Sequence, residues 1–227
     1  MLIVNGAGSS LGRALVSAQA GKERVIAISR DTDLSSFGVV NVNAQSAAML
    51  ERALRDLDFD EFGGEGLTWV NCQAIRLNSL LLNCSSSMID ESFRVNFQSN
   101  FVAVKSLLPK MISLRYGRFI FIGSSIAEKG DIGCFPYSVS KLTNQALQRS
   151  ITLECSRFGV TANTISIGVV ESPLWFELSE KSRKAIEEKI PGKKMVSLGE
   201  FCDLVAFIRG AASLNGQTVR LDGGYSA

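Results

Sequence analysis

The sequence of 227 residues contains no histidine. This absence excludes catalytic triads built on a histidine base and metal sites with imidazole ligands. The five cysteines are scattered and odd in number, and none forms a Cys-x-x-Cys pair, so neither a disulfide framework nor a zinc site is predicted. We expect reduced thiols and no bound metal.

Long apolar runs are also missing. No stretch approaches the roughly 20 apolar residues that span a bilayer, and the first residues lack the pattern of a signal peptide. A net charge of +2 gives no reason to expect nucleic acid or an anionic membrane as a partner. The composition, 46% apolar and 20% charged, indicates one globular domain over residues 1–227, expected in the cytoplasm.

Among the residues that are present, Tyr137 and Lys141 stand four positions apart, where a helix is predicted to begin near Pro136. This spacing places both side chains on one helix face. A phenol has an unperturbed pKa of about 10. A fixed ammonium nearby lowers that pKa, so the pair could exchange a proton with a carbonyl or alcohol oxygen. Ser124 follows a predicted buried strand at 119–122, at the sheet edge where ligands bind. Taken alone, the pair could equally be a solvated surface pair.

A glycine-rich turn follows the first predicted strand. Glycines at 6, 8 and 12 lead into a helical pattern, an arrangement in which backbone N–H groups and the positive helix end meet a pyrophosphate. Leu11 stands where a Gly-x-Gly-x-x-Gly motif has its third glycine, and an ordinary tight turn is the alternative. The second predicted strand ends in Ser29 and Arg30 rather than an acid. Arginine here favours the 2′-phosphate of NADP over NAD, unless it is a solvated loop charge.

Short apolar runs alternate with helical patterns along the chain. Strands are predicted at 2–4, 24–29, 39–42, 67–70, 119–122, 160–165 and 217–221. Helices are predicted after residue 12 and at 44–57, 90–116, 136–158, 175–190 and 199–210. Loops are predicted at 58–66 and 166–174, and a loop with a short helix at 75–87. This alternation predicts an α/β Rossmann fold, a doubly wound seven-stranded parallel sheet with helices on both faces.

Seven motifs, in order, resemble those of the short-chain dehydrogenase/reductase family in its single-domain form, and they cover essentially the whole chain. They are the turn at 5–12, Asn71-Cys-Gln-Ala, Asn96, Ser124, the Tyr137 and Lys141 pair, the loop at 166–173 and the ending at 216–225. The ending is similar to that of the 3-oxoacyl-carrier-protein reductase branch. The departures from the family pattern are Asn5, Ser10, Asn41, Ala74 and Ile167.

The resemblance implies a role for each matching residue. Tyr137 would be the general acid in carbonyl reduction and the base in alcohol oxidation. Lys141 would lower its pKa and bind the nicotinamide ribose, Ser124 would hydrogen-bond the substrate oxygen, and Asn96 would hold a water that links Lys141 to solvent. The residues expected to bind the cofactor are Gly6, Ser9, Ser10, Leu11, Gly12, Ser29, Arg30, Asn41, Val42, Asn71, Cys72, Ala74, Tyr137, Lys141, Gly168, Val170 and Ser172. Residues 172–198 would form a lid over the substrate.

The sequence thus predicts an NADPH-dependent oxidoreductase that reduces a carbonyl to a secondary alcohol, in the manner of a 3-oxoacyl-carrier-protein reductase. One alternative is an NAD(P)-dependent alcohol or sugar dehydrogenase that works oxidatively. Another is a non-catalytic NADP(H)-binding redox sensor. The helices near 90–116 and 138–158 are usual subunit contacts in such folds, so a homo-oligomer, a tetramer or a dimer, is also expected.

Overall fold

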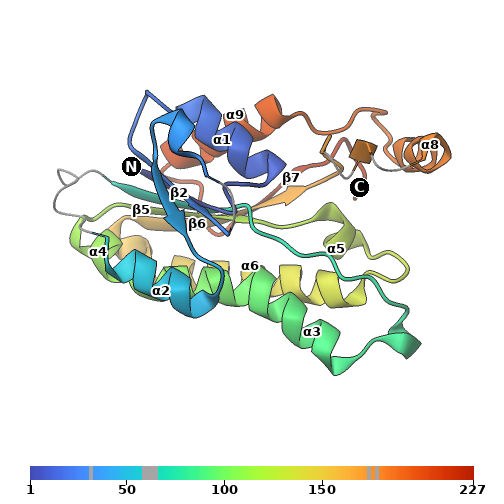
Figure 1. Ribbon diagram of the computed structural model, residues 1–227, viewed down its shortest axis with the longest axis horizontal. Helices are drawn as coiled ribbons and strands as arrows, with labels where there is room; N and C mark the ends of the chain where they lie inside the picture. The colour runs from blue at the N-terminus through green and yellow to red at the C-terminus, as the bar shows by residue number, and fades with distance from the viewer. Residues whose placement is uncertain (31–32, 58–65, 173–174, 177–178) are drawn as a thin grey trace.

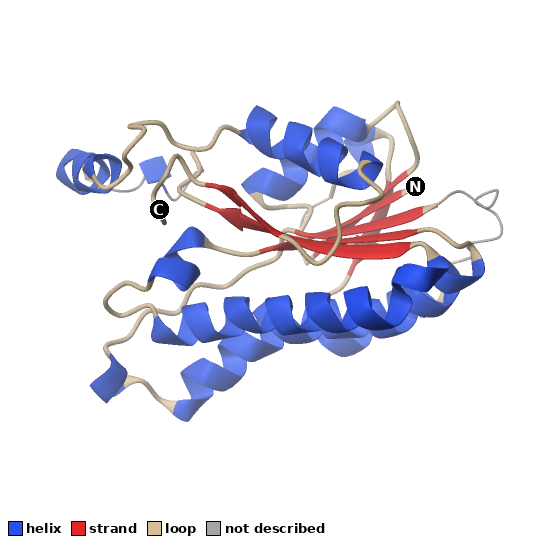
Figure 2. Ribbon diagram, turned by 180° about the vertical axis from the view of Figure 1, so that it is seen from behind, coloured by secondary structure: helices blue, strands red, loops and turns tan. Residues whose placement is uncertain are grey.

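Seven parallel strands form one sheet at the centre of the molecule (Figures 1 and 2). The computed structural model describes residues 1–30, 33–57, 66–172, 175–176 and 179–227. The sheet order is β3-β2-β1-β4-β5-β6-β7. The strands are β1 (Leu2–Asn5), β2 (Val25–Ser29), β3 (Val40–Asn43), β4 (Leu67–Asn71), β5 (Gly117–Ile122), β6 (Val160–Ile167) and β7 (Thr218–Leu221). This confirms the predicted fold class.

Helices cover both faces of the sheet (Figure 2). One face carries α1 (Ser10–Gln19) and α9 (Leu198–Gly210), and the other carries α2 (Ala47–Arg55), α4 (Ser99–Ser113) and α6 (Phe135–Cys155). Three further helices, α3 (Ser86–Phe93), α5 (Ser125–Lys129) and α8 (Glu180–Glu188), gather at the end of the molecule that β5 reaches with its carboxyl end (Figure 1).

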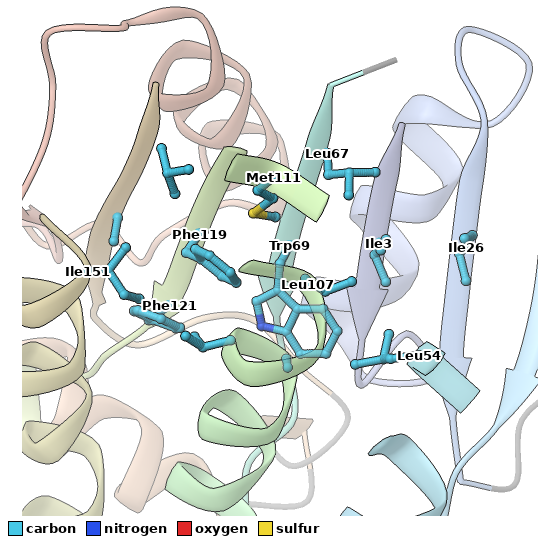
Figure 3. Packing of buried hydrophobic residues seen from close by; sticks show 14 of the residues in the cluster. Ile3, Ile26, Leu54, Leu67, Trp69, Leu107, Met111, Phe119, Phe121 and Ile151 are labelled. Atoms are coloured by element: carbon cyan, nitrogen blue, oxygen red, sulfur yellow. The ribbon is translucent and has the colours of Figure 1, made fainter. Parts of the chain in front are cut away.

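The core has two parts because side chains along a strand alternate between the two faces. Leu2 and Val4 pack with Leu15 of α1 and Phe201 of α9, whereas Ile3 belongs to the cluster on the other face. In that second cluster, Trp69, Phe119 and Phe121 pack with Leu107 and Met111 of α4 (Figure 3). The completely buried strands, such as β4 and β5, therefore read as continuous apolar runs in the sequence.

The predicted long helix at 90–116 is present as three consecutive helical segments, α3, a π-helical segment and α4, that together run from Ser86 to Ser113. Between α3 and α4 the chain makes a π-helical segment, Arg94–Gln98, that includes Asn96. The main-chain oxygen of Asn96 accepts a hydrogen bond from Asn144 Nδ2 at 3.0 Å. A π turn inserts one residue into a helix and so re-aims a side chain, which explains why an asparagine stands here.

Other boundaries differ by a few residues. β6 continues to Ile167 because Ser166 and Ile167 pair with Arg220 and Leu221 of β7, so the predicted loop at 166–174 starts later. The short helix α5 was not predicted, and neither were the 3-10 turns at Ser35–Phe37 and Ser156–Phe158; a third 3-10 turn, Leu81–Asn83, lies in the predicted loop at 75–87. The predicted loop at 58–66 lies outside the described residues except for Gly66, and so does Leu174 of the predicted lid.

Two absences hold for the described part of the chain. No helix there is long and apolar enough to cross a membrane. Nor do three or more Cys, Asp or Glu side chains gather there in a group that could hold a metal ion.

Candidate active site

Tyr137 and Ser124 line one cavity of about 660 Å³, here named the tyrosine pocket. Ser124 directly precedes α5, after β5 has ended at Ile122, and Tyr137 lies in the first turn of α6 behind Pro136. Proline is tolerated in a first turn because the N–H that it lacks would have no helical acceptor. The structure thus brings the predicted serine and tyrosine together at the carboxyl end of the sheet.

Lys141 lies one turn further along α6, beneath the pocket. Its side chain is buried, and Nζ donates to the main-chain oxygen of Ile122 at 2.8 Å. Nζ is 5.9 Å from the centre of the Tyr137 ring. Burial lowers the pKa of Lys141 to about 8, and the neighbouring Cys72 opposes this. The pKa of the Cys72 thiol is in turn raised to about 12, mainly by burial.

The pKa of Tyr137 is raised above its ordinary value. Burial is the largest cause, because it disfavours the charged phenolate. A hydrogen bond from Ser124 and the positive charge of Arg76 act in the opposite direction. The net shift in this structure is upward, and the cation that opposes it is Arg76. The predicted lowering of this pKa by Lys141 stays a prediction.

Asn96 holds the loop after β4 against α6. Its Nδ2 donates to the main-chain oxygen of Ile75 and to Ser140 Oγ, both at 2.9 Å, and its Oδ1 accepts from the N–H of Ile75 at 2.9 Å. Both amide hydrogens are thereby used. These contacts make Asn96 a positioning residue, and its water relay stays a prediction.

A second cavity of about 530 Å³, here named the glycine groove, lies beside the tyrosine pocket. Its lining comes from the starts and ends of several elements. The lining residues are Asn5, Gly6, Gly8, Ser9, Ser10, Leu11, Ser29, Arg30, Ala44, Cys72, Gln73, Ala74, Val170 and Ser172. Ten of these fourteen are among the predicted cofactor residues. Asn5 and Gly8 belong to the predicted glycine-rich turn, and Ala44 and Gln73 were not predicted.

The glycine turn is shaped by close backbone approach. Gly6 has a φ of +74°, and a Cβ there would lie 2.4 Å from the main-chain nitrogen of Gln73. A Cβ on Gly12 would lie 2.3 Å from the main-chain oxygen of Gly6. Glycine is therefore required at both positions, which brings the start of α1 against the end of β4.

The start of α1 suits an anionic group. The first N–H groups of a helix have no acceptor within it. Ser9 Oγ accepts from the N–H of Gly12 at 3.1 Å, while Ser10 and Leu11 line the groove at this positive helix end. Glycine turn, helix start and groove together fit the pyrophosphate of a dinucleotide.

Several predicted cofactor residues lie outside the groove lining. Gly12 packs behind Gly6, and Asn71 is buried, where its Oδ1 accepts from Asn5 Nδ2 at 3.0 Å. Asn41 and Val42 lie on the edge strand β3, where Asn41 Nδ2 donates to Asp33 Oδ1 at 3.4 Å.

Two more predicted cofactor residues, Tyr137 and Gly168, line the tyrosine pocket, and Lys141 lies buried beneath it. At the far end of the groove, Ser29 and Arg30 stand where β2 ends. Asp31, which follows them in the sequence, lies outside the described residues.

Val170 and Ser172 line both cavities. They follow β6, and Val170 forms a parallel bridge with Val196. The groove and the pocket therefore meet at this segment. A molecule in the groove that reaches Val170 would come next to one held by Ser124 and Tyr137.

Comparison with known proteins settles the family. A family model described as enoyl-(acyl carrier protein) reductase matches residues 5–226. The chain belongs to the short-chain dehydrogenase/reductase family. Members of this family are NAD(P)-dependent oxidoreductases, and the resemblance carried by the seven motifs is confirmed.

Curated short-chain dehydrogenase/reductases similar to this chain include two 3-oxoacyl-[acyl-carrier-protein] reductases. That of Rickettsia conorii is 31% identical over 156 residues, which is 67% of this chain and 65% of the relative. That of Buchnera aphidicola subsp. Baizongia pistaciae is 26% identical over 234 residues, 98% of this chain and 95% of the relative. The first match thus spans just under two thirds of the relative.

Solved structures share the fold, among them a short-chain dehydrogenase/reductase. One from Serratia marcescens superposes with a TM-score of 0.89 at 23% identity, over 100% of this chain and 97% of the other. A gluconate dehydrogenase from Agrobacterium tumefaciens, described as putative, gives 0.88 at 22% identity, over 100% and 96%.

One charged residue of this short-chain dehydrogenase/reductase site was missed by the sequence analysis. Arg76 lies in the segment predicted as a polar loop with a short helix and given no role in the site, yet it lines the tyrosine pocket with Asn78. Its place two residues after Ala74, at the end of the Asn71 motif, was the available signal. Because the Asn71 motif ends at the site, the residues that directly follow it also lie near the site.

Proposed function

We propose that this chain is an NADPH-dependent carbonyl reductase that converts a ketone into a secondary alcohol, in the manner of a 3-oxoacyl-carrier-protein reductase. The observation that carries the proposal is the placement of Tyr137 and Ser124 in one pocket that meets the glycine groove at Val170 and Ser172. A bound nicotinamide cofactor would supply the hydride. The protein supplies orientation and the proton.

In this proposal Tyr137 donates its phenolic proton to the carbonyl oxygen as the alcohol forms. The raised pKa of Tyr137 keeps the phenol protonated at neutral pH, as a general acid requires. Ser124 donates a hydrogen bond to the same oxygen and stabilises the charge that develops there. Lys141 lies below Tyr137, and its Nζ is held by the main-chain oxygen of Ile122. It also neighbours Cys72, which lines the glycine groove.

The cofactor preference is part of the proposal. Arg30 lines the end of the groove at the carboxyl end of β2, where a guanidinium can pair with a 2′-phosphate. Ser29 lines the groove beside it. NADPH is therefore the proposed reductant.

The test is NADPH consumption with a panel of carbonyls: a 3-oxoacyl thioester, a diketone, a quinone and a keto sugar. NADH, Tyr137→Phe and the matched control Tyr116→Phe are measured in parallel. We expect turnover that prefers NADPH, persists in Tyr116→Phe and falls at least about 1,000-fold in Tyr137→Phe, because the proton donor is lost. Tight NADPH binding without turnover of any carbonyl would contradict the proposal and favour the redox-sensor interpretation.

We also propose a homo-oligomer that uses the outer faces of α4 and α6. Large apolar side chains are exposed there: Phe101 on α4, and Leu142 and Leu153 on α6, of which Leu153 is 86% exposed. Light scattering of the purified protein tests this. A monomer at all concentrations measured would contradict it.

A further inference from the structure

The tyrosine pocket carries a cation beside the reacting tyrosine. The guanidinium carbon of Arg76 lies 5.9 Å from the centre of the Tyr137 ring. Lys189 adds a second positive charge to the lining, and Asp131 is the one carboxylate there. Within the described lining the balance of charge is positive.

Arg76 is held in place by neutral partners. Its Nε donates to Asn78 Oδ1 at 3.2 Å, and its Nη2 donates to Cys134 Sγ at 3.3 Å. Among the described residues no carboxylate lies within ion-pair distance of it, and Nη1 donates to none of them. Thiol sulfur is a weak acceptor. The guanidinium is thus oriented but keeps donors and its full charge for a ligand.

Asp131, the one carboxylate in the described lining, bonds to a main-chain N–H group rather than to Arg76. Asp131 Oδ1 accepts from the N–H of Ile132 at 2.9 Å, within the turn that leads to α6. Tyr225 lines the same pocket, and the charge of Arg76 acts on it. There burial and Asp131 raise the pKa of Tyr225, and Arg76 lowers it. Arg76 therefore faces the cavity that would hold the substrate.

We infer that the substrate carries a compact oxyanion, a carboxylate or a phosphate, close to the carbonyl that is reduced, and that Arg76 binds it. This rests on the proposed function and specifies its substrate class. An arginine fork matches both anions in geometry, and such charge-assisted pairs are among the stronger hydrogen bonds. When Ser124 and Tyr137 hydrogen-bond the carbonyl oxygen of the substrate, an anionic group a few bonds from that carbonyl lies on the side of Arg76. A 3-oxoacyl thioester has no charge at that position, so a carbonyl compound with a free carboxylate or phosphate is the better substrate.

The experiment compares each anionic substrate with an uncharged counterpart. The ratio of kcat/KM is measured for 3-oxobutanoate against its methyl ester, and for dihydroxyacetone phosphate against dihydroxyacetone, which separates carboxylate from phosphate. We expect one anion to be preferred and Arg76→Gln to lower that preference about 10- to 100-fold. Arg76→Lys should retain part of it. Arg52→Gln, at an exposed arginine of α2, is the matched control and should leave the ratio unchanged.

A second measurement does not depend on turnover. Calorimetry with 3-hydroxybutanoate, its methyl ester and glycerol 3-phosphate gives the affinity of the wild type and of Arg76→Gln. Tighter binding of an anion than of the ester, lost in Arg76→Gln, supports the inference even if no carbonyl is reduced and the proposed function fails. Affinity for both anions that is no higher than for the ester, or a preference that survives in Arg76→Gln, would overturn it.

Discussion

Asn144 joins α6 to the π-helical turn: its Nδ2 donates to the main-chain oxygen of Asn96 at 3.0 Å. Its Oδ1 accepts from Asn100 Nδ2 at 2.8 Å, and Asn144 and Asn100 are both buried. Asn71 Nδ2 donates in turn to Asn100 Oδ1 at 2.9 Å. A continuous amide network therefore connects the end of β4 to the helix that carries Tyr137 and Lys141.

The first prediction concerns this network. Asn144→Ala leaves the amide of Asn100 and the main-chain oxygen of Asn96 without their partner in a buried site. We expect the free energy of unfolding to fall by about 2–4 kcal/mol. Urea denaturation measures it, with the exposed Asn83→Ala as the control, for which a change within about 0.5 kcal/mol is expected. Equal stability of the two variants would contradict the role of the network.

The second prediction concerns the buried Lys141. The folded protein lowers its pKa from 10.5 to about 8, so the charged form is disfavoured by folding. The unfolded chain then binds more protons between these two values, and the penalty is present below pH 8 and disappears as the pH rises to about 10.5. We expect Lys141→Met to be more stable than the wild type at pH 7 by about 1–3 kcal/mol, while activity is lost.

The measurement for Lys141→Met is urea denaturation at pH 7 and again near pH 10. The advantage of the variant should shrink at the higher pH. Lys181→Met, an exposed lysine of α8, should show no such pH dependence. A variant that is less stable than the wild type at pH 7 would show that the bond to Ile122 outweighs the cost of burying the ammonium.

The third prediction uses two glycines with nearly equal backbone angles. Gly6 has a φ of +74° and Gly21 a φ of +76°, but a Cβ at Gly21 would meet no atom within 4 Å. Alanine at either position has the same backbone strain, so any further loss in Gly6→Ala reports the contact with Gln73. We expect Gly6→Ala to abolish NADPH binding, measured by fluorescence titration. Gly21→Ala should bind with unchanged affinity, and equal affinity of the two variants would count against the groove as the binding site.

The fourth prediction concerns Arg30. Arg30→Ser removes the guanidinium from the end of the groove. The NADPH-to-NADH ratio of kcat/KM should fall about 10- to 100-fold, because one charge-assisted pair is lost. Arg52→Ser, an exposed arginine of α2, is the control. A wild-type protein that prefers NADH would remove the basis of this prediction.

The sequence predicted the fold well because its signals are local. The fully buried strands appear as short apolar runs, and their alternation with helical patterns determines a parallel sheet. The glycine turn and the positions of Ser124, Tyr137 and Lys141 were also predicted from the sequence. A fixed spacing along a helix or after a strand determines which face or sheet edge a side chain occupies. The observed ends of elements differ from the predicted ones where pairing with a neighbouring strand sets the length, as at Ser166 and Ile167 of β6.

Other features of the site depend on contacts between distant segments. The π turn at Asn96 involves Ile75 and Asn144, which are distant in the chain. The upward shift of the Tyr137 pKa follows from burial, which spacing does not reveal. Arg76 enters the pocket because the loop after β4 is held by Asn96. These features follow from tertiary structure and were therefore not predicted from the sequence.

The composition of the glycine groove has a consequence for synthesis on the ribosome. Its lining joins Gly6 and Ser9 near the start of the chain to Val170 and Ser172, more than 160 residues later. Contacts of such large sequence separation form late and slowly. A nascent chain whose residue 172 has not yet left the ribosome cannot complete the groove. A bound nucleotide can therefore stabilise only the nearly finished protein. Ligand-dependent protection from protease should therefore appear only for chains that extend well beyond Ser172.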